Sequence, residues 1–399
     1  MRPVLVINSG SSSLKYQLID VDTEQALAVG VQERIGTSNA TIHHRGTTGV
    51  VTERVRPIPD HTAAFREMLD VFAEVGPDLS TIQLVALGHR VVHGGSKFVD
   101  PTVLTPDVES AIDELSALAP LHNPANLQGI RAARVAFPSV PHVAVFDTAF
   151  HHTLPPAAYT YAIDSQLAQQ YQIRRYGFHG TSHRYVSGVA ARMLDRDPSD
   201  VRQIVLHLGN GASACAVRGG VSVDVSMGMT PLEGLVMGTR SGDIDPGALI
   251  ALARQANLDP DQLDELLNRR SGLFGLTGNN DMRDVRALAD AGDPAARRGL
   301  DVTVHRLTHY VGAYTAILGR LDALTFTAGV GENDAVLRAE LCAGLEGLGI
   351  ILDAELNTRQ SRDARVISAE ESAVTVFVVP TNEELEIARQ AAVAVSESL

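Results

Sequence analysis

Short runs of apolar residues alternate with segments of helical periodicity along the whole chain, a pattern typical of an α/β protein. Residues 4–7 form the first apolar run and lead into a polar, glycine-containing turn at residues 8–13. Residues 14–19 then alternate between apolar and polar, as a half-buried strand does. We therefore predict a strand, a tight turn and a second strand at the N-terminus, rather than a strand that leads into a helix.

The same pattern returns half a chain later, at residues 204–217. Setting Gly10 against Gly209 gives a separation of 199 residues, since 209 − 10 = 199. Two hairpins with glycine-rich tips at this spacing predict a duplicated domain whose tips face a common cleft. Because hairpins are common, chance similarity is the alternative explanation.

The domain organisation follows from length and from one proline-rich segment. A chain of 399 residues exceeds what one hydrophobic core usually serves, so two domains of roughly 150–200 residues each are expected. Residues 143–146 form an apolar strand, and the Pro155-Pro156 pair that follows favours a domain boundary. We predict a first domain at residues 1–150, joined by a C-terminal helix at residues 384–399, and a second domain at residues 151–383.

Three helices have recognisable signals. Asn123 followed by Pro124 is typical of an N-cap with proline at the first helical position, and residues 295–318 have the periodicity of a long helix. Thr381 and Glu384 have the spacing of a capping box, which predicts that they open the C-terminal helix. In that case Glu383 is free to point elsewhere.

Composition excludes several classes of protein. The chain has 33 Lys and Arg against 47 Asp and Glu, a formal net charge of −14, so a diffuse basic surface for nucleic acid or anionic membrane is excluded. Its two cysteines, Cys215 and Cys342, are too few for a disulfide framework or a cysteine-based zinc site. With no signal-peptide core and no long apolar stretch, we expect a soluble, cytoplasmic protein with no nucleic-acid or membrane partner.

Four glycine-rich segments let backbone N–H groups approach a bulky anion. They are residues 10–13, 209–211, 238–242 and 329–333. The last follows an apolar run at residues 324–327 and precedes a predicted helix from Asp334, which places its donors near a helix N-terminus. Ordinary turns are the alternative for each, because none matches a known phosphate-loop motif. Together they favour binding of nucleotide phosphates.

The few placed cations are the candidates for binding an anionic substrate. Lys15 directly follows the serine turn, Arg90 follows an apolar run, and Arg240 is flanked by two glycines. Arginine can bind a carboxylate or a phosphate through two parallel hydrogen bonds, which fixes orientation as well as charge. A surface salt bridge is the alternative for each arginine.

Histidines and acids supply the remaining candidates. His179 and His183 have the i,i+4 spacing of a helical zinc pair, but a histidine that contacts phosphate oxygens or is simply packed fits this segment better. Asp147 ends an apolar strand, where it could hold Mg²⁺, accept a proton or cap the next turn. Asp281 is either part of a ligand site or an N-cap.

Taken together, these motifs resemble those of the acetate kinase family in their residues and in their order along the chain. The resemblance covers nearly the whole chain. The matching segments are residues 8–15, 88–95, 146–151, 175–183, 207–213, 237–243, 329–333 and 381–384.

The resemblance implies a fold of two duplicated actin-like, or ribonuclease H-like, α/β domains that flank an ATP cleft. It implies the reversible, Mg²⁺-dependent, in-line transfer of the ATP γ-phosphoryl group to acetate, which gives acetyl phosphate and ADP, with Mn²⁺ as an alternative ion. Members of the family are typically homodimers, and the resemblance implies that the second domain carries both the nucleotide site and the dimer interface.

Carried over position by position, the resemblance implies that Asp147, His179 and Arg240 are catalytic, and that Asn8 and Glu383 position the metal ion. It implies that Arg90 holds acetate and that the methyl group lies in a pocket of Val92, Leu121, Phe178 and Pro231. It implies ATP contacts from Lys15, Ser11, Ser13, His207, Leu208, Gly209, Asn210, Gly211, Asp281, Met282, Arg283, Gly329, Val330, Gly331, Glu332 and Asn333.

Met282 departs from the family, which more often has phenylalanine at this position, so packing of the base or ribose is less well defined than binding of the phosphates. A carboxylic acid with a pKa near ~4 is ionised at pH 7 and needs no general base, so our hypothesis is that Asp147 mainly orients Mg²⁺ or water. Alternatives are a kinase for propionate or butyrate and an actin- or Hsp70-like ATPase without an acceptor pocket.

Overall fold

Both predicted hairpins form. Strand β1 (Pro3–Ser9) pairs antiparallel with β2 (Ser13–Asp20), and the Gly10 N–H donates to the Ser13 carbonyl at 2.9 Å to close the turn. Strand β9 (Arg202–Leu208) pairs in the same way with β10 (Ala212–Arg218). At this second tip the Gly209 N–H donates to the Gly211 carbonyl at 3.0 Å.

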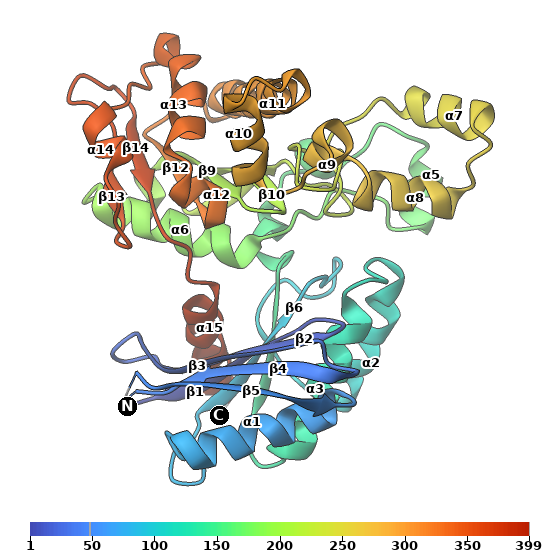
Figure 1. Ribbon diagram of the computed structural model, residues 1–399, viewed down its shortest axis with the longest axis vertical. Coiled ribbons are helices and arrows are strands. Elements are labelled where there is room, and N and C mark those ends of the chain that lie inside the picture. The colour runs from blue at the N-terminus through green and yellow to red at the C-terminus, as the bar shows by residue number, and fades with distance from the viewer. Residues whose placement is uncertain (48, 399) are drawn as a thin grey trace. The chain divides into compact units, whose positions relative to one another are not determined.

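The computed structural model describes residues 1–47 and 49–398. The chain divides into two units, and the first returns at the C-terminus (Figure 1). Unit 1 is Met1–Ala149 with Asn382–Leu399, and unit 2 is Phe150–Thr381. Within the described residues, none of the helices has the length and apolar character needed to cross a membrane.

Unit 1 contains an eight-stranded sheet in the order β5-β4-β3-β2-β1-β6-β8-β7. Its other strands are β3 (Gln25–Glu33), β4 (Thr37–Arg45), β5 (Val51–Ile58), β6 (Ala86–Val91), β7 (Thr102–Val103) and β8 (His142–Phe146). Its helices are α1 (His61–Val75), α2 (Pro106–Glu114), α3 (Asn123–Ala136) and α15 (Glu383–Ser398).

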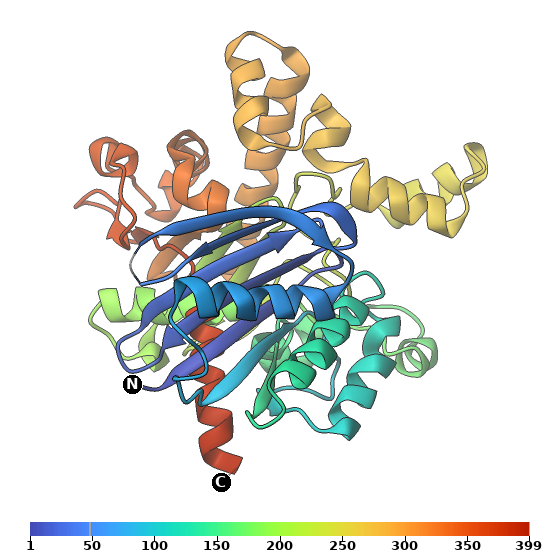
Figure 2. The ribbon, with the colours of Figure 1, turned by 60° about the horizontal axis from the view of Figure 1, so that its bottom comes forward.

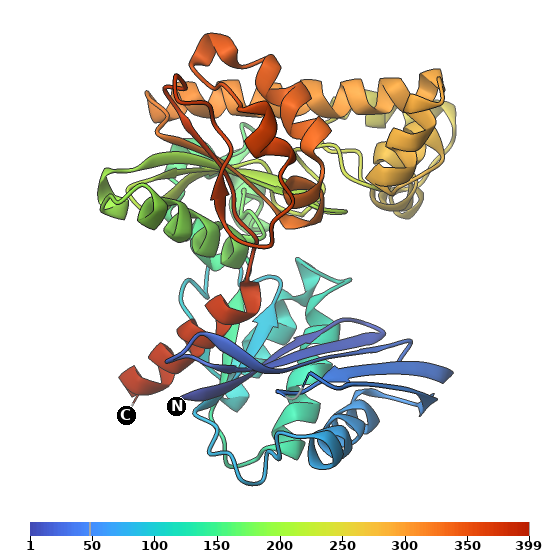
Figure 3. The same cartoon turned by 60° about the vertical axis from the view of Figure 1, so that its left-hand side comes forward.

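The two faces of this sheet pack against different helices. Leu5 and Ile7 of β1 belong to a core cluster with Phe65 and Phe72 of α1. The opposite face is covered by α15, because a Cβ built on Gly88 would lie 2.8 Å from Ile387. Figure 2 shows α1 over the strands, and Figure 3 shows α15 on the opposite face.

Unit 2 contains a six-stranded sheet in the order β11-β10-β9-β12-β14-β13. Its remaining strands are β11 (Val221–Val225), β12 (Ala323–Thr327), β13 (Arg365–Val366) and β14 (Thr375–Val378). Its helices are α4 (Pro156–Tyr159), α5 (Ser165–Gln170), α6 (Gly180–Met193), α7 (Pro246–Gln255), α8 (Pro260–Arg269), α9 (Gly272–Thr277), α10 (Met282–Asp290), α11 (Pro294–Leu318), α12 (Ala328–Asn333), α13 (Ala335–Ala343) and α14 (Ala354–Thr358).

The two sheets share one strand order, which confirms the predicted duplication. In unit 1, β3-β2-β1 is an antiparallel meander and β1, β6 and β8 are parallel. In unit 2, β11-β10-β9 is the corresponding meander and β9, β12 and β14 are parallel. The glycine tips of the two hairpins therefore occupy the same topological position.

The predicted helix starts were wrong in detail. Asn123 is the first residue of α3 and not its N-cap, because its carboxamide bonds the backbone of His93 instead. The C-terminal helix begins at Glu383, and the Asn382 side chain accepts from the Leu385 N–H at 3.0 Å. The Thr381 hydroxyl bonds Ser182, so no capping box with Glu384 forms. Residue 399, the last of the predicted helix, lies outside the described residues.

The segment at residues 329–333 is helical and is not the glycine loop that we predicted. It forms most of α12, and α13 follows after the N-cap Asp334, whose side chain accepts from the Leu337 N–H. Arg338 explains the difference, because its buried guanidinium donates to the Gly331 and Glu332 carbonyls at the end of α12. The predicted long helix, in contrast, is confirmed as α11.

Gly129 of α3 provides a test of the packing between α3 and β1. A Cβ at this position would lie 2.0 Å from Ser9 Oγ, so Gly129→Ala should lower the thermal unfolding midpoint by overpacking, at a cost of ~1–3 kcal/mol. Gly312→Ala in α11 is the matched control, because nothing lies within 4 Å of its Cβ position and alanine favours the helix by up to ~1 kcal/mol. Calorimetry showing a shift of the same sign in both variants would contradict the close approach.

Candidate active site

A row of polar side chains crosses the sheet of unit 1 on the face that α15 covers. Asn8 lies opposite Lys15, and the parallel register of Ile7 with His89 places Asn8 beside Arg90. Directly opposed residues in neighbouring strands share a face of the sheet. The predicted metal, phosphate and acetate residues of unit 1 are thus brought together by strand register.

Arg90 and Asp147 form a two-point ion pair within unit 1. The Arg90 guanidinium donates from Nε at 2.9 Å and from Nη2 at 2.6 Å to the two carboxylate oxygens of Asp147. The Asp147 N–H donates to the Val91 carbonyl at 3.0 Å, so the strand ends are linked by backbone as well. Both oxygens of the predicted catalytic carboxylate therefore bind the predicted acetate arginine.

Burial and charge act in opposite directions on this pair. Burial raises the pKa of Asp147, and the Arg90 guanidinium opposes the rise. For Arg90, burial lowers the pKa, but the carboxylates of Asp147 and Glu383 outweigh it and raise the pKa. Arg90 is thus a permanent cation. In the described part of the chain its Nη1 donates no hydrogen bond, so the Nη1–Nη2 edge faces no protein acceptor pair.

Two amide side chains of α3, neither of which the sequence motifs marked as part of a site, hold these segments in place. Asn126 accepts from the Val92 N–H at 3.1 Å and donates to the Ser9 carbonyl at 2.8 Å. Asn123 bonds both backbone groups of His93. Their i,i+3 spacing on a helix was the available signal, because residues three apart lie on one face.

The serine turn that carries Ser11 and Ser13 has its own support. His61, at the start of α1, bonds the Gly10 carbonyl through Nε2 at 2.9 Å. Ser11 is exposed and Ser13 is half-buried. The turn is therefore anchored from its backbone, and its hydroxyl groups are left near the surface of unit 1.

Asn8 and Glu383 have the chemistry of a hard-cation site. In the described chain neither side chain has a hydrogen-bond partner, and Glu383 lies close enough to Asp147 and Arg90 to affect their pKa values. Amide and carboxylate oxygens are ligands that Mg²⁺ accepts, usually together with waters and substrate phosphates. Across the described residues, no group of three or more His, Cys, Asp or Glu side chains is arranged to hold a metal.

In unit 2, His179 immediately precedes α6 in a left-handed conformation, with φ +56°. Such a φ is uncommon for a residue with a side chain and often marks a functional position. Its Nδ1 lies 2.9 Å from Ser213 Oγ, and its ring stacks on His207 with centroids 4.1 Å apart. His183 bonds the same hydroxyl, so the i,i+4 pair shares a serine and is not arranged as a zinc site.

Arg240 lies beside His179 without a carboxylate partner among the described residues. It donates from Nη1 to the Pro231 carbonyl at 2.8 Å, and burial lowers its pKa. A Cβ built on Gly211 would lie 3.4 Å from Arg240 Nη2 and 3.6 Å from His179 Nε2. Two of the predicted catalytic residues, His179 and Arg240, therefore lie close to the second glycine tip.

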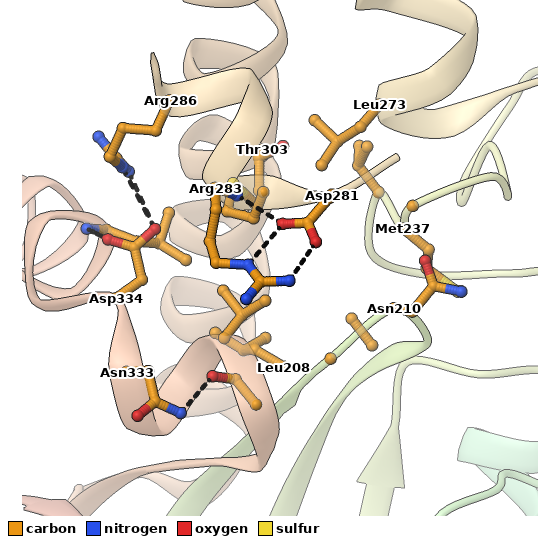
Figure 4. A pocket seen from close by; sticks show the side chains of 18 of the residues that line it. Leu208, Asn210, Met237, Leu273, Asp281, Arg283, Arg286, Thr303, Asn333 and Asp334 are labelled. Atoms are coloured by element: carbon orange, nitrogen blue, oxygen red, sulfur yellow. Dashed lines mark hydrogen bonds and ion pairs between the residues drawn. The ribbon is translucent and has the colours of Figure 1, made fainter. Parts of the chain in front are cut away.

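A pocket of about 990 Å³ in unit 2 is lined by many of the residues that are predicted to contact ATP. Figure 4 shows side chains from α10, α12 and the hairpin tip around it. The predicted residues that line it are Leu208, Gly209, Asn210, Asp281, Met282, Arg283, Gly329, Val330 and Asn333. The volume is at the upper end of the range for small-molecule sites, ~300–1,000 Å³.

The pocket also has lining residues that the motifs missed. Arg286 and Asp334 form an ion pair at its edge, and Met237, Leu273 and Thr303 complete the wall. Arg286 follows Met282 by one helical turn, so the helical period of α10 was the available signal. Asp281 caps α10 by accepting from the Arg283 N–H, and the side-chain bonds from Arg283 lower the pKa of Asp281 to about 2.

Other predicted ATP residues of unit 2 lie outside that lining. His207 bonds Ser182 through Nδ1 at 2.8 Å, and the Glu332 carboxylate accepts from the Thr381 N–H at 3.1 Å. Gly331 provides a carbonyl to Arg338 at 2.8 Å. Glu332 therefore holds the end of the unit 2 chain, a contact that the sequence motifs do not indicate.

The four predicted methyl-pocket residues divide between the units. Val92 and Leu121 belong to unit 1, where Val92 is buried and Leu121 is 54% exposed. Phe178 and Pro231 belong to unit 2, where the Phe178 ring is fully buried and the Pro231 carbonyl accepts from Arg240. Of the four, Pro231 has a direct contact with a predicted site arginine.

Comparison with known proteins gives close matches over the whole chain. The model of the acetokinase family matches residues 3–389. The acetate kinase of Leifsonia xyli subsp. xyli (strain CTCB07) is 67% identical over 396 residues, which cover 99% of this chain and 100% of that protein. The acetate kinase of Clavibacter michiganensis subsp. michiganensis (strain NCPPB 382) is 62% identical over 390 residues, 98% of each chain.

Solved structures agree with these sequence matches. The crystal structure of Porphyromonas gingivalis acetate kinase has a TM-score of 0.94 at 41% identity, covering 99% of this chain and 100% of that one. A propionate kinase from Francisella tularensis subsp. tularensis SCHU S4 has a TM-score of 0.91 at 41% identity, covering 98% and 99%.

The shared strand order of the two sheets and these structural matches define the class as the duplicated actin-like, or ribonuclease H-like, α/β fold. The predicted fold class is confirmed. Within that class the chain belongs to the acetokinase family.

The buried, neutral side chain of His151 makes the folding stability of the chain depend on pH. Burial lowers the pKa of His151 to about 4. Between pH 6.5 and 4 the unfolded chain therefore binds a proton that the folded chain does not, and stability falls as pH falls. From pH 7 to 5 this one group should cost about 2 kcal/mol.

His151→Gln should reduce that loss, measured by urea unfolding at pH 7 and pH 5. The matched control is His305→Gln at an exposed position of α11, which should leave the pH dependence of the parent chain. An unchanged difference between the two pH values in His151→Gln would refute the role of His151.

Proposed function

We infer that the protein catalyses the reversible in-line transfer of the ATP γ-phosphoryl group to acetate, giving acetyl phosphate and ADP. The observation that carries this proposal is the Arg90–Asp147 pair. Asp147 holds the guanidinium by its Nε–Nη2 edge and leaves the Nη1–Nη2 edge, which matches the two oxygens of a carboxylate. The relatives named acetate kinase support acetate as that carboxylate.

Charge is the main obstacle in this reaction, because both reactants are anions. Acetate is ionised at neutral pH and attacks without a general base. Lys15 and Arg90 in unit 1 and His179 and Arg240 in unit 2 would offset the repulsion and stabilise charge on the equatorial phosphoryl oxygens. Arg240 suits this role because no carboxylate in the described chain neutralises it.

Asp147 acts, in this proposal, mainly by orienting Arg90. Both of its oxygens accept from the guanidinium, which also fixes the arginine against rotation. This adds a specific partner to the hypothesis that Asp147 orients a metal ion or water.

The metal ion is proposed to be Mg²⁺, with Mn²⁺ as an alternative, held by Asn8 and Glu383. Their oxygen donors, which have no hydrogen-bond partner in the described chain, fit that ion. When bound, the ion would neutralise phosphate charge. Lys15 lies opposite Asn8, so it would reach the same phosphates.

The nucleotide is proposed to bind in the pocket of unit 2. Met282 and Leu208 would pack against the base or ribose, and the small residues of the Gly209–Gly211 tip would let the phosphates come close to the backbone. The remaining predicted residues, Ser11, Ser13, His207, Asp281, Arg283 and Gly329 to Asn333, complete the proposed ATP contacts.

We further propose that the protein is a cytoplasmic homodimer with its interface in unit 2. Exposed apolar side chains at Ile250 and Leu252 of α7 and at Phe274 and Leu276 of α9 support this interface. Light scattering of the purified chain, compared with Ile250→Glu, tests the dimer.

Acceptor specificity tests the function. A coupled assay over formate, acetate, propionate and butyrate should give the highest kcat/KM with acetate. Propionate is the second candidate, because one methylene in an apolar pocket discriminates by only ~1–3 kcal/mol and a propionate kinase is among the structural matches. ATP hydrolysis that does not depend on any carboxylate would instead favour an actin- or Hsp70-like ATPase.

The two arginines should give different kinetic defects. Arg240→Ala should lower kcat about 100-fold or more with a smaller change in the acetate KM, because it acts on charge that develops in the transition state. Arg90→Ala should raise the acetate KM at least tenfold, because it removes the carboxylate site. Steady-state kinetics in which Arg240→Ala keeps its kcat would remove Arg240 from the transition state.

A further inference from the structure

One buried hydroxyl links two histidines of unit 2. Ser213, on β10, is fully buried, and its Oγ lies 2.9 Å from His179 Nδ1 and 2.7 Å from His183 Nε2. Ser213 makes no other side-chain hydrogen bond within the described residues. Its single hydroxyl hydrogen must therefore serve one histidine, and its oxygen must accept from the other.

The position of the hydrogen on the His183 ring decides which histidine the Ser213 hydroxyl donates to. His183 is fully buried, and burial lowers its pKa well below the usual value, so the ring is neutral. Its Nδ1 has no hydrogen-bond partner among the described residues. A buried N–H without an acceptor is rarer than an unused acceptor atom, so the hydrogen belongs on Nε2, where Ser213 accepts it.

That donation leaves the Ser213 hydroxyl hydrogen for His179. The hydrogen points to Nδ1 of His179, which must then be a bare nitrogen with a lone pair. A neutral imidazole has one N–H hydrogen, so in His179 that hydrogen is on Nε2. This is the nitrogen that lies 3.6 Å from the Cβ position of Gly211, beside Arg240 Nη2 at 3.4 Å.

We propose that Ser213, oriented by His183, is a positioning residue that holds His179 in the tautomer with its hydrogen on Nε2. His179 then acts as a neutral, directed hydrogen-bond donor next to the Arg240 guanidinium. A neutral donor adds a hydrogen bond to the phosphoryl oxygens without placing a second cation against Arg240. The catalytic use of this tautomer rests on the proposed phosphoryl transfer, but the assignment of the tautomer does not.

The ring is held by more than one contact, which makes its orientation specific. The left-handed backbone at His179 sets the direction of the side chain, and the stacked His207 ring blocks one face. His207 is in turn bonded to Ser182. The Ser213 hydroxyl adds a restraint that also distinguishes the two ring nitrogens of His179.

Nitrogen-15 NMR of the histidine-labelled protein tests the tautomer without turnover. At pH 8.5, well above the ordinary histidine pKa of about 6.5, His179 should show a bare Nδ1 and a protonated Nε2. Assignment uses the spectrum of His179→Gln. A protonated Nδ1 at His179, or a protonated Nδ1 at His183, would overturn the proposal even if the enzyme is an acetate kinase.

Kinetics test the consequence. Ser213→Ala should lower kcat roughly tenfold with less than a threefold change in the acetate and ATP KM, because about 1.4 kcal/mol of transition-state stabilisation is lost per tenfold in rate. Ser222→Ala is the matched control. Ser222 is also fully buried and also bonds a histidine Nδ1, that of His151 at 2.8 Å, so it reports the general cost of removing a buried hydroxyl.

A double-mutant cycle separates positioning from a structural role. If Ser213 acts through His179, Ser213→Ala should change kcat by less than twofold in the His179→Gln background. An equal fall in kcat in both backgrounds, or a kcat of Ser213→Ala equal to that of Ser222→Ala, would overturn the positioning role. Circular dichroism melting curves of the four variants identify any that fail to fold, and for these the NMR result on the parent chain decides.

Discussion

The guanidinium groups of the candidate site must be held in a fixed orientation. The two-point ion pair of Arg90 with Asp147 meets that constraint in unit 1. A chain with a net charge of −14 can bind anions only where a few cations are concentrated. Burying an arginine strengthens its field but requires partners for its five N–H donors. Removing one partner of a fully buried pair costs about 3–5 kcal/mol. The cost is smaller here, because the Arg90 side chain is 22% exposed, but Asp147 is buried, so the pair is a structural element as well as a candidate site.

Two arginines of unit 2, Arg240 and Arg338, meet the same constraint with neutral partners. Arg240 is held by the Pro231 carbonyl, and in the part of the chain that the structure describes Arg338 donates to the oxygens of Gly331, Glu332 and Asn357. Burial lowers the pKa of Arg338 to about 10, so it stays charged at neutral pH. A guanidinium held by neutral oxygens keeps a net positive charge that can attract an anion. A guanidinium paired with a carboxylate is instead fixed in its orientation, and its charge is offset.

The sequence predicted the parts of the fold that depend on local pattern. The two hairpins, the strand before Asp147 and helix α11 follow from alternation and helical period alone. The helix caps at Asn123 and Thr381 could not be predicted in this way, because His93 and Ser182 compete for their side chains from distant positions. Propensity offers a residue several hydrogen bonds, and tertiary contacts choose among them.

The candidate site shows the same division. Arg90, Arg240 and the glycine tips stand out because residue type and flanking residues suggest chemistry on their own. Asn126 and Ser213 do not stand out, since an asparagine in a helix and a serine in a strand are ordinary. Their importance lies in partners such as Ser9, which is 117 residues from Asn126 in the sequence. The residues that position a site are therefore harder to predict than the residues that act in it.

The duplication adds a further step to this argument, because equivalent strand ends have diverged in chemistry. In unit 1 the ends of β1, β6 and β8 present Asn8, Arg90 and Asp147. In unit 2 the equivalent strands β9 and β12 lead into the Gly209–Gly211 tip and into the short helix α12. Ligands of open α/β sheets bind at the carboxyl ends of the strands. One topology thus carries amide and charged side chains at the strand ends of one copy, and a glycine tip and a short helix at the strand ends of the other.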